Sequence, residues 1–297
     1  MQTVFKTKNK IQDTTGMKIG RWVIRLFFAL WALIVAFPVV WTLYTSLKTD
    51  QEFFERPFAF PKSPQWQNFV NAWNEGNFGS YFFNSLVTVV VTLLITLVVV
   101  STTAYALAKF KGRGIGILEK FYMIAMMIPG VLTLVPLYYM AEDITMNTGI
   151  PLTDNLISLS LMYAITGMPF YIFMLTGFMR GINNSLLEAA ELDGASQFSI
   201  FFRIILPLIK PSLFVVGLLN VMGTWNEYMT ALTFLHDEKN YTIAIGLSYL
   251  TNAGTYDVDY GRLFAGLAIA LIPILIMYAV FQKQLQNGIA SNEGVKG

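Results

Sequence analysis

The chain has 297 residues, of which 55% are hydrophobic and only 13% are charged, a composition too apolar for a soluble domain. Its formal net charge of +2 is too small to indicate nucleic-acid binding. Because the sequence contains no cysteine, a disulfide framework, a thiolate metal site and a cysteine nucleophile are excluded. The composition therefore places the chain in a lipid bilayer.

Six stretches are long and apolar enough to cross a hydrocarbon core of about 30 Å, which takes about 20 helical residues. One of them is interrupted by Glu227. Each stretch must satisfy its own backbone hydrogen bonds in lipid, which predicts helices. Prolines at 129, 136, 169 and 273 fall inside these stretches and predict kinks. The predicted spans are 26–47, 76–108, 121–141, 155–179, 211–235 and 263–282.

Basic residues gather on one side of the predicted spans. Fifteen of the 20 Lys and Arg residues fall in the two terminal tails and in loops 109–120 and 180–210. The positive-inside rule places these segments in the cytoplasm. The three outer loops hold five basic residues against eleven acids, and they are 48–75, 142–154 and 236–262.

The charge pattern predicts an all-α integral membrane protein with six transmembrane helices and both termini in the cytoplasm. We expect a cytoplasmic tail over 1–20, a six-helix transmembrane domain over 21–284 and a cytoplasmic C-terminal tail over 285–297. A cleaved signal peptide over 21–47 is disfavoured, because the apolar run is too long and no small-x-small site ends it. The first outer loop is rich in Phe, Trp and Pro, which predicts that it lies on the membrane surface or packs over the spans.

The cytoplasmic loop 181–210 is unusually rich in helix signals. Ser185 and Glu188 have the spacing of a capping box, which predicts a short helix that starts near residue 186. Gly194 then offers a left-handed turn, and Ser196 predicts the cap of a second helix. Pro207 and Pro211 interrupt the path into the next span. By residue chemistry alone, an amphipathic helix on the inner membrane face and a docking helix remain alternatives.

The same loop reads E-A-A, three residues, G, nine residues, then I-x-L-P. This pattern resembles the cytoplasmic loop of permease subunits of binding-protein-dependent ABC importers. The resemblance implies two short helices that sit in a groove on a cytoplasmic ATPase, so that closure of the ATPase dimer moves the spans. The implied ATPase-coupling residues are Glu188, Ala189, Ala190, Gly194, Ile204, Leu206 and Pro207.

Three further stretches, 225–228, 240–247 and 294–297, are similar to the smaller permease of maltose-type carbohydrate importers. A charge in mid-bilayer costs roughly 2.5 to 3.5 kcal/mol, so Glu227 is expected either to face a cavity or to lie near the interface. Rings and planar polar groups suit sugar recognition, which makes the following residues candidates for the substrate pathway: Trp225, Asn226, Glu227 and Tyr228. By resemblance, the candidates for contact with a binding protein are Tyr241, Thr242, Tyr249, Tyr256 and Tyr260.

The resemblance implies a multi-pass subunit of a bacterial plasma membrane, surrounded by lipid, that imports a carbohydrate, with an oligosaccharide favoured. Its implied partners are a second permease subunit, two copies of a cytoplasmic ATPase and an extracellular or periplasmic sugar-binding protein. The sequence has no Walker A motif, so ATP and Mg are assigned to the ATPase. It also lacks a catalytic set and a metal motif, and Asp257 and Asp259 are interpreted as solvated charges.

The alternative function is a stand-alone secondary transporter or channel for a small polar solute. Such proteins place ionisable residues in several spans to couple substrate or ions. Here only Glu227 lies within a predicted span. The scarcity of such charges favours the subunit of an ATP-driven importer.

Overall fold

A computed structural model describes residues 15–252 and 259–290 of the chain. The described residues form helices joined by loops, and no strand occurs among them. The helices are α1 (Thr15–Thr45), α2 (Asp50–Glu55), α3 (Gln67–Asn74), α4 (Phe78–Lys109), α5 (Arg113–Met127), α6 (Gly130–Thr148), α7 (Leu156–Arg180), α8 (Asn184–Leu192), α9 (Gln197–Ile200), η1 (Phe201–Ile205), α10 (Leu206–Leu208), α11 (Lys210–Asn226), α12 (Met229–Phe234), η2 (Glu238–Asn240), α13 (Ile243–Asn252) and α14 (Tyr260–Ala290).

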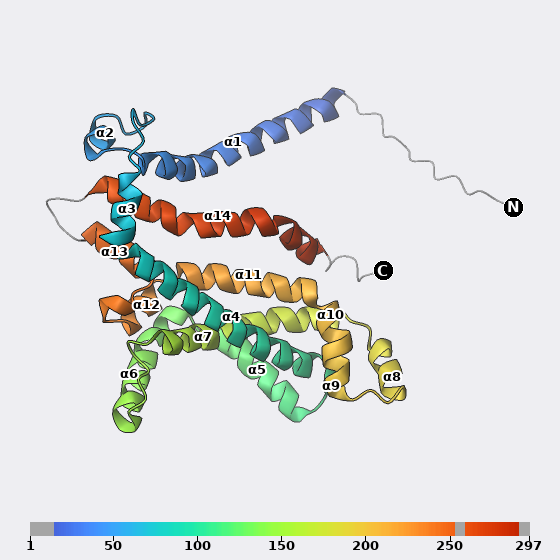
Figure 1. Cartoon of the computed structure of the whole chain (residues 1–297). Coiled ribbons are helices and arrows are strands. Elements are labelled where there is room, and N and C mark those ends of the chain that lie inside the picture. The colour runs from blue at the N-terminus through green and yellow to red at the C-terminus, as the bar shows by residue number, and fades with distance from the viewer. Residues whose placement is uncertain (1–14, 253–258, 291–297) are drawn as a thin grey trace.

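Helices α4, α7, α11 and α14 lie side by side, with α8 and α9 at one end of the molecule and α2, α3, α12 and α13 at the other (Figure 1). Four helices, α1, α4, α7 and α14, are each long and apolar enough to cross a membrane. The number of spans reaches six if each of two bent helix pairs counts as one span. The all-helical membrane fold is confirmed, whereas the count of six and the side of the termini stay predictions.

The predicted span 121–141 is wrong as a single helix. Helix α5 ends at Met127, and α6 starts at Gly130 after a bend of 104°. Ile128 between them is extended, with φ −78° and ψ 120°. This break follows from Pro129, because proline disfavours the helical conformation in the residue before it and has no N–H to donate.

The predicted span 211–235 is also divided. Helix α11 ends at Asn226, Glu227 is extended (φ −72°, ψ 126°), and α12 starts at Met229. Glu227 therefore lies at a helix break and not within a continuous helix. At its other end, α11 meets the helical stretch 197–208 at an angle of 74°.

The centre of the molecule is the packing of α4 against α7. Small polar residues allow this close approach: the Thr92 hydroxyl donates to the Ser160 carbonyl (3.2 Å), and the Ser160 hydroxyl donates to the Thr88 carbonyl (3.3 Å). Two buried apolar clusters lie along this pair, one toward α12 and α13 and the other toward α8, α9 and η1.

Helix α1 extends away from the other helices along most of its length (Figure 1). No residue in its most apolar stretch of 18 residues is buried. It joins the rest of the molecule through Trp41, whose ring meets the edge of Phe264 at 5.1 Å. Phe53 of α2 stacks on Tyr260 of α14 at 4.7 Å. The prediction that the first outer loop packs over the spans is therefore confirmed.

Helical structure extends beyond the predicted boundaries of the membrane domain. Helix α1 already begins at Thr15, within the predicted tail 1–20, and α14 continues to Ala290, within the predicted tail 285–297. The apolar stretches in the sequence mark where a helix can cross lipid, but polar turns at both ends continue the same hydrogen-bond ladder.

Candidate coupling segment and membrane cavity

The coupling segment, defined here as residues 181–210, connects α7 to α11. Its first helix, α8, begins with Asn183, whose side-chain carbonyl accepts a hydrogen bond from the Ser185 backbone N–H at 3.0 Å. The predicted capping box of Ser185 and Glu188 is therefore wrong, because Asn183 and not Ser185 is the N-cap residue of α8. The predicted second cap is confirmed, since Ser196 accepts from the Ser199 N–H at 3.2 Å.

Gly194 ends the first helix in a left-handed conformation, with φ +80°. Its N–H donates to the Glu191 carbonyl at 3.0 Å, and the Ala195 N–H donates to the Ala190 carbonyl at 2.9 Å. This pair of bonds is the Schellman motif, which satisfies the last carbonyls of a helix and favours glycine at the left-handed position. The turn predicted at Gly194 is therefore confirmed.

The end of α4 holds the coupling segment in place. The Lys109 ammonium donates to the Ile182 carbonyl (2.8 Å) and to the side-chain oxygen of Asn184 (3.0 Å). The Tyr105 hydroxyl donates to Gln197 at 2.8 Å. Ile200 and Ile205 are fully buried in the apolar cluster behind these bonds. Helices α8 and α9 are therefore fixed to the end of α4 by hydrogen bonds and by apolar packing.

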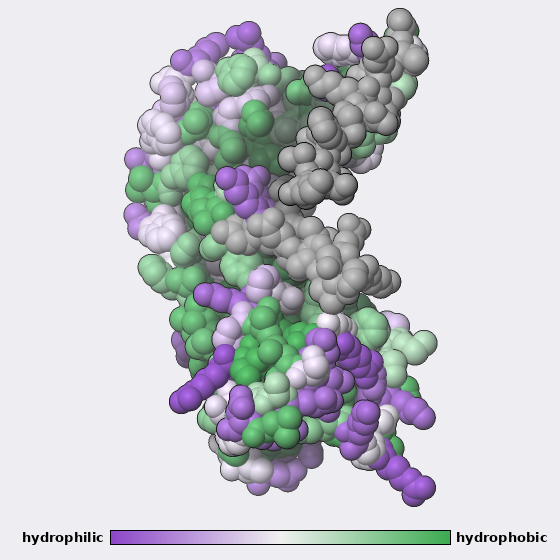
Figure 2. Space-filling model, turned by 90° about the vertical axis from the view of Figure 1, so that its right-hand side faces the viewer, coloured by the Kyte–Doolittle hydropathy of each residue, from purple (hydrophilic) through white to green (hydrophobic). Residues whose placement is uncertain are grey.

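Two large apolar side chains project from α8 and α9, one on each side of the turn that joins them. Leu192 is 90% exposed and Phe198 is 74% exposed. Figure 2 views this end of the molecule and shows hydrophobic and hydrophilic residues interleaved across its lower half. Side chains of this kind are typical of a protein contact surface. The sequence motif did not single out either residue. The signal for Leu192 is that it lies on a different face of α8 from the buried Leu187.

The predicted coupling residues divide by exposure. Ala190, Ile204 and Leu206 are half-buried and pack against the inner apolar cluster. The side available to a partner is formed by Glu188, Ala189, Gly194 and Pro207, which are exposed.

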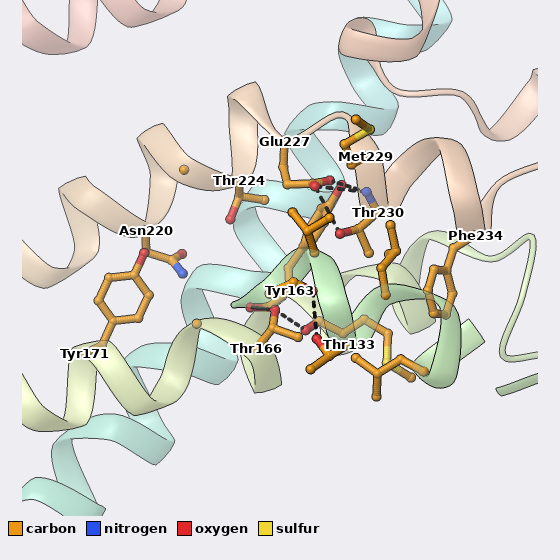
Figure 3. A pocket seen from close by; sticks show the side chains of 17 residues that line it. Thr133, Tyr163, Thr166, Tyr171, Asn220, Thr224, Glu227, Met229, Thr230 and Phe234 are labelled. Atoms are coloured by element: carbon orange, nitrogen blue, oxygen red, sulfur yellow. Dashed lines mark hydrogen bonds between the residues drawn. The ribbon is translucent and has the colours of Figure 1, made fainter. Parts of the chain in front are cut away.

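A cavity of about 440 Å³ lies between α6, α7, α11 and α12 (Figure 3). Glu227 is the only charged residue among its described lining residues. The other polar lining residues supply hydroxyl and amide groups, and they are Thr133, Tyr163, Thr166, Tyr171, Asn220, Thr224 and Thr230.

The Glu227 carboxylate holds the start of α12. It accepts hydrogen bonds from the Thr230 N–H (2.9 and 3.1 Å), the Thr230 hydroxyl (3.0 Å) and the Ala231 N–H (3.2 Å). The two N–H groups are unsatisfied donors of a helix N-terminus, where a carboxylate is favourable. Glu227 therefore both lines the cavity and caps the helix that forms one side of it.

Two polar atoms beside the cavity have no hydrogen-bond partner among the described residues. They are the hydroxyl of Tyr163, which is 7% exposed, and the side-chain carbonyl of Asn220, which is 2% exposed. The Asn220 amide group is engaged, since it donates to the Thr96 hydroxyl at 3.3 Å. Buried polar atoms without partners are costly, so these two suit a hydroxyl-bearing ligand.

The other three residues predicted for the substrate pathway do not line this cavity. Trp225 is buried in the core, where its indole N–H donates to the Ala270 carbonyl at 3.1 Å. The Asn226 amide donates to the Met222 carbonyl at 2.8 Å, and the Tyr228 hydroxyl lies 2.9 Å from that of Ser248. The sequence signal for the cavity lining was helix periodicity. Residues 220, 224 and 227 are three to four positions apart, a spacing that places them on one face.

Comparison with known proteins agrees with the sequence motif. Residues 101–291 match the family described as binding-protein-dependent transport system inner membrane component. This chain belongs to that family. It is a multi-pass transport permease of the plasma membrane, and the predicted membrane location is confirmed.

Relatives cover nearly the whole permease. The diacetylchitobiose uptake system permease protein NgcG of Streptomyces coelicolor is 30% identical, over 88% of this chain and 84% of that protein. The arabinooligosaccharides transport system permease protein AraQ of Bacillus subtilis is 31% identical, over 97% of this chain and 100% of that protein. A crystal structure of a bacterial ABC transporter for alginate import has the same fold, with a TM-score of 0.79 at 21% identity over 91% of this chain and 98% of that one.

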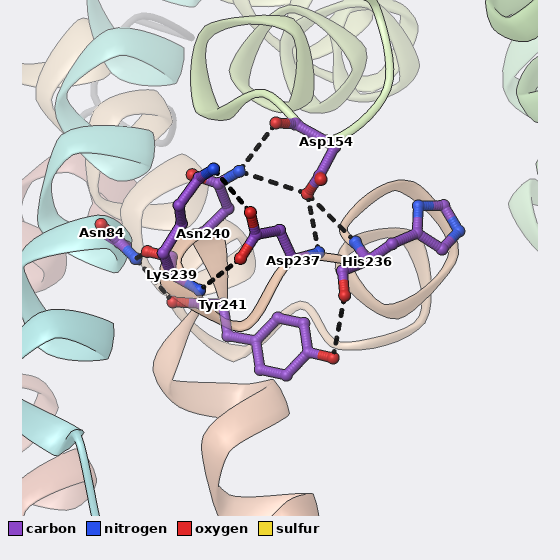
Figure 4. A network of polar contacts seen from close by, with 7 residues as sticks. All are labelled: Asn84, Asp154, His236, Asp237, Lys239, Asn240 and Tyr241. Atoms are coloured by element: carbon purple, nitrogen blue, oxygen red, sulfur yellow. Dashed lines mark hydrogen bonds and ion pairs between the residues drawn. The ribbon is translucent and has the colours of Figure 1, made fainter.

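On the end opposite α8, the permease holds loop 236–241 through Asp154 (Figure 4). Asp154 is left-handed (φ 54°), and its carboxylate accepts from the backbone N–H groups of His236 (3.1 Å) and Asp237 (3.0 Å). The Asn240 amide donates to the Asp154 backbone carbonyl at 2.8 Å, and the Asn84 amide of α4 donates to the Tyr241 carbonyl at 2.9 Å. The loop is therefore fixed from both sides.

This arrangement corrects part of the predicted contact with a binding protein. Tyr241 and Thr242 are 7% and 5% exposed, so their side chains are buried within the permease. Tyr241 packs on Tyr249, and the two hydroxyls are 2.8 Å apart. Tyr249 remains 49% exposed, Tyr260 is half-buried against Phe53, and Tyr256 lies outside the described residues.

Asp154→Asn is expected to lower the stability of the permease by about 1–2 kcal/mol at neutral pH, because it removes charged hydrogen bonds. Burial raises the pKa of the Asp154 carboxyl, but the bonds from Asp237, Asn240 and His236 outweigh it, so the pKa lies below its ordinary value. The stabilisation is thus complete above the ordinary pKa of about 4 and is lost as pH falls through the folded-state pKa.

Thermal unfolding in detergent at pH 7 and at lower pH measures this difference. Asp143→Asn is the matched control, because Asp143 is an exposed acid of α6, the helix that precedes the loop of Asp154. An Asp154→Asn variant with the same midpoint as the native protein at pH 7 would contradict the role of Asp154.

Proposed function

We propose that this permease is the membrane-spanning subunit of an ATP-driven importer for a carbohydrate, and that it forms half of the translocation pathway. A second permease subunit forms the other half, two copies of a cytoplasmic ATPase bind ATP and Mg, and an extracellular or periplasmic sugar-binding protein delivers the cargo. The chain itself performs no catalysis. Family membership is the observation that supports this proposal most directly.

The order of the elements supports coupling between the ATPase and the cavity. The coupling segment follows α7 and precedes α11, and both helices contribute residues to the cavity. The same segment is bonded to the end of α4, which packs along α7. A displacement of α8 and α9 by an ATPase therefore reaches α7 and α11, on two sides of the cavity, through short, packed connections. Such connections allow a small shift to switch the helices between two discrete arrangements.

The names of relatives favour an oligosaccharide as cargo, because they refer to diacetylchitobiose and to arabinooligosaccharides. The alginate importer has also been determined with an alginate pentasaccharide bound to its periplasmic protein. The cavity of the present chain offers hydroxyls and amides, and no basic side chain occurs among its described lining residues. That chemistry suits a neutral sugar better than an acidic one, because a carboxylate would find no counter-charge.

Co-purification tests the proposal. Full-length permease is purified from its native membrane, and we expect a second permease, an ATPase and a sugar-binding protein to accompany it. The ligand released from the binding protein is then identified. Recovery of the permease alone, with solute transport driven by an ion gradient and without ATP, would instead support a secondary transporter.

Replacing both Leu192 and Phe198 with Glu is expected to release the ATPase while leaving the second permease bound. The two side chains are the most exposed apolar groups of the coupling segment, and burying a carboxylate in their place is strongly unfavourable. Phe60→Glu is the matched control, because Phe60 is 76% exposed in the segment between α2 and α3, two helices at the opposite end of the molecule. Equal ATPase recovery with the double variant and the control would contradict this docking surface.

A further inference from the structure

An apolar groove of about 370 Å³ lies between α4, α11 and α14, separate from the cavity described above. Among its described lining residues Lys210 is the only polar one, and it lies at the start of α11. Leu213, Gly217 and Val221 continue from Lys210 along one face of α11, at helical spacing. The described lining of the groove is therefore apolar, with one positive charge at one end.

The dimensions of the groove match one leaflet of a membrane. Lys210 and Val221 are eleven residues apart, which corresponds to about 16 Å along a helix. Half of a hydrocarbon core is about 15 Å thick. Lys210 lies at the coupling-segment end of α11, on the side predicted to face the cytoplasm (Figure 1). The groove therefore extends from the predicted inner surface to about mid-bilayer.

The groove is open because Gly217 has no side chain. A Cβ on Gly217 would meet the side chain of Leu93 at 3.4 Å and that of Leu97 at 3.8 Å. A larger residue at this position would therefore project into the space between α11 and α4. Lys210 is exposed, and no carboxylate of the described residues lies within ion-pair distance of it.

We propose that this groove binds an anionic phospholipid of the inner leaflet, with one acyl chain along α11 and the phosphate on Lys210. Basic residues at the cytoplasmic ends of grooves between membrane helices favour acidic head groups. The assignment does not depend on the cargo of the permease. It places a lipid at the 74° bend where the coupling segment turns into α11, so the lipid would stabilise the joint through which the segment moves α11.

Native mass spectrometry of the full-length permease, purified with its bound subunits, tests the site. The complex is exchanged into mixtures of phosphatidylglycerol and phosphatidylcholine with identical acyl chains. We expect retention of phosphatidylglycerol by the native protein. Lys210→Gln should lower the preference for phosphatidylglycerol about fivefold, since one lysine near an acidic head group contributes about 1 kcal/mol. Lys120→Gln, which removes a charge outside the groove, should leave the preference unchanged.

Gly217→Leu provides an independent test, because it fills the groove without changing any charge. This variant should lose both lipids, whereas Gly116→Leu, on an open face of α5, should retain them. Equal lipid retention in Lys210→Gln and Lys120→Gln would overturn the proposal. So would crosslinking from a single cysteine at Leu213 to another polypeptide in place of a photoactivatable phosphatidylglycerol; the native chain has no cysteine to interfere.

Discussion

Gly194→Pro is expected to reduce uptake to background and to remove the response of the ATPase to substrate, while the permease remains in the membrane. Gly194 has φ +80°, and its N–H donates to the Glu191 carbonyl. Proline fixes φ near −65° and has no N–H, so the turn between α8 and α9 cannot form. The two helices would then point in different directions, and the surface around Leu192 and Phe198 would be lost.

Uptake of labelled sugar and substrate-stimulated ATPase activity in proteoliposomes measure this effect. Gly194→Asn is the control, because asparagine tolerates the left-handed conformation and keeps the N–H. Its uptake should stay close to that of the native protein. Normal stimulation of the ATPase in Gly194→Pro would show that the turn is not needed for coupling.

Glu227→Ala is expected to lower uptake about tenfold. Helix caps contribute about 0.5–2 kcal/mol, and about 1.4 kcal/mol corresponds to a factor of ten in the population of an ordered state. Without the carboxylate, the Thr230 and Ala231 N–H groups lose their acceptor and α12 is no longer held beside the cavity. The protein should still assemble with the ATPase, because α8 and α9 lie at the other end of the molecule.

Glu227→Gln separates the cap from the charge. The glutamine carbonyl still accepts one of the bonds from Thr230, so this variant should retain much of the uptake if Glu227 acts as a cap. Uptake as low as that of Glu227→Ala would mean that the negative charge itself is required. Transport rates at saturating binding protein, together with complex recovery by gel filtration, make this comparison independent of assembly.

Local patterns predicted the coupling segment well, because its features depend on neighbouring residues. A glycine that ends a helix and a serine that begins one act within a few positions, and both Gly194 and Ser196 do what their chemistry favours. The choice between Asn183 and Ser185 as the first cap was not predictable in the same way. Both residues suit the position, and the path of the chain out of α7 decides which one occupies it.

The cavity was only partly predictable. Glu227 stood out because an acid in an apolar span is costly, but Tyr163 and Asn220 did not, since tyrosine and asparagine are ordinary in membrane helices that pack together. Trp225, next to Glu227 in the sequence, points into the core and hydrogen-bonds to α14. Neighbouring residues in a helix face different directions, so the four consecutive side chains of 225–228 cannot all reach one sugar site.

The sequence by itself determined the membrane class, the positions of the apolar stretches and the family motif, because hydrophobicity, charge and short spacing are properties of the chain alone. Pro129 in the sequence already predicted a kink near Ile128, but only the tertiary structure decided that the span 211–235 is broken at Glu227 and that Tyr241 and Thr242 face inward. Those outcomes depend on which helices pack together and on which distant groups, such as Asp154 and Asn84, satisfy a loop's backbone.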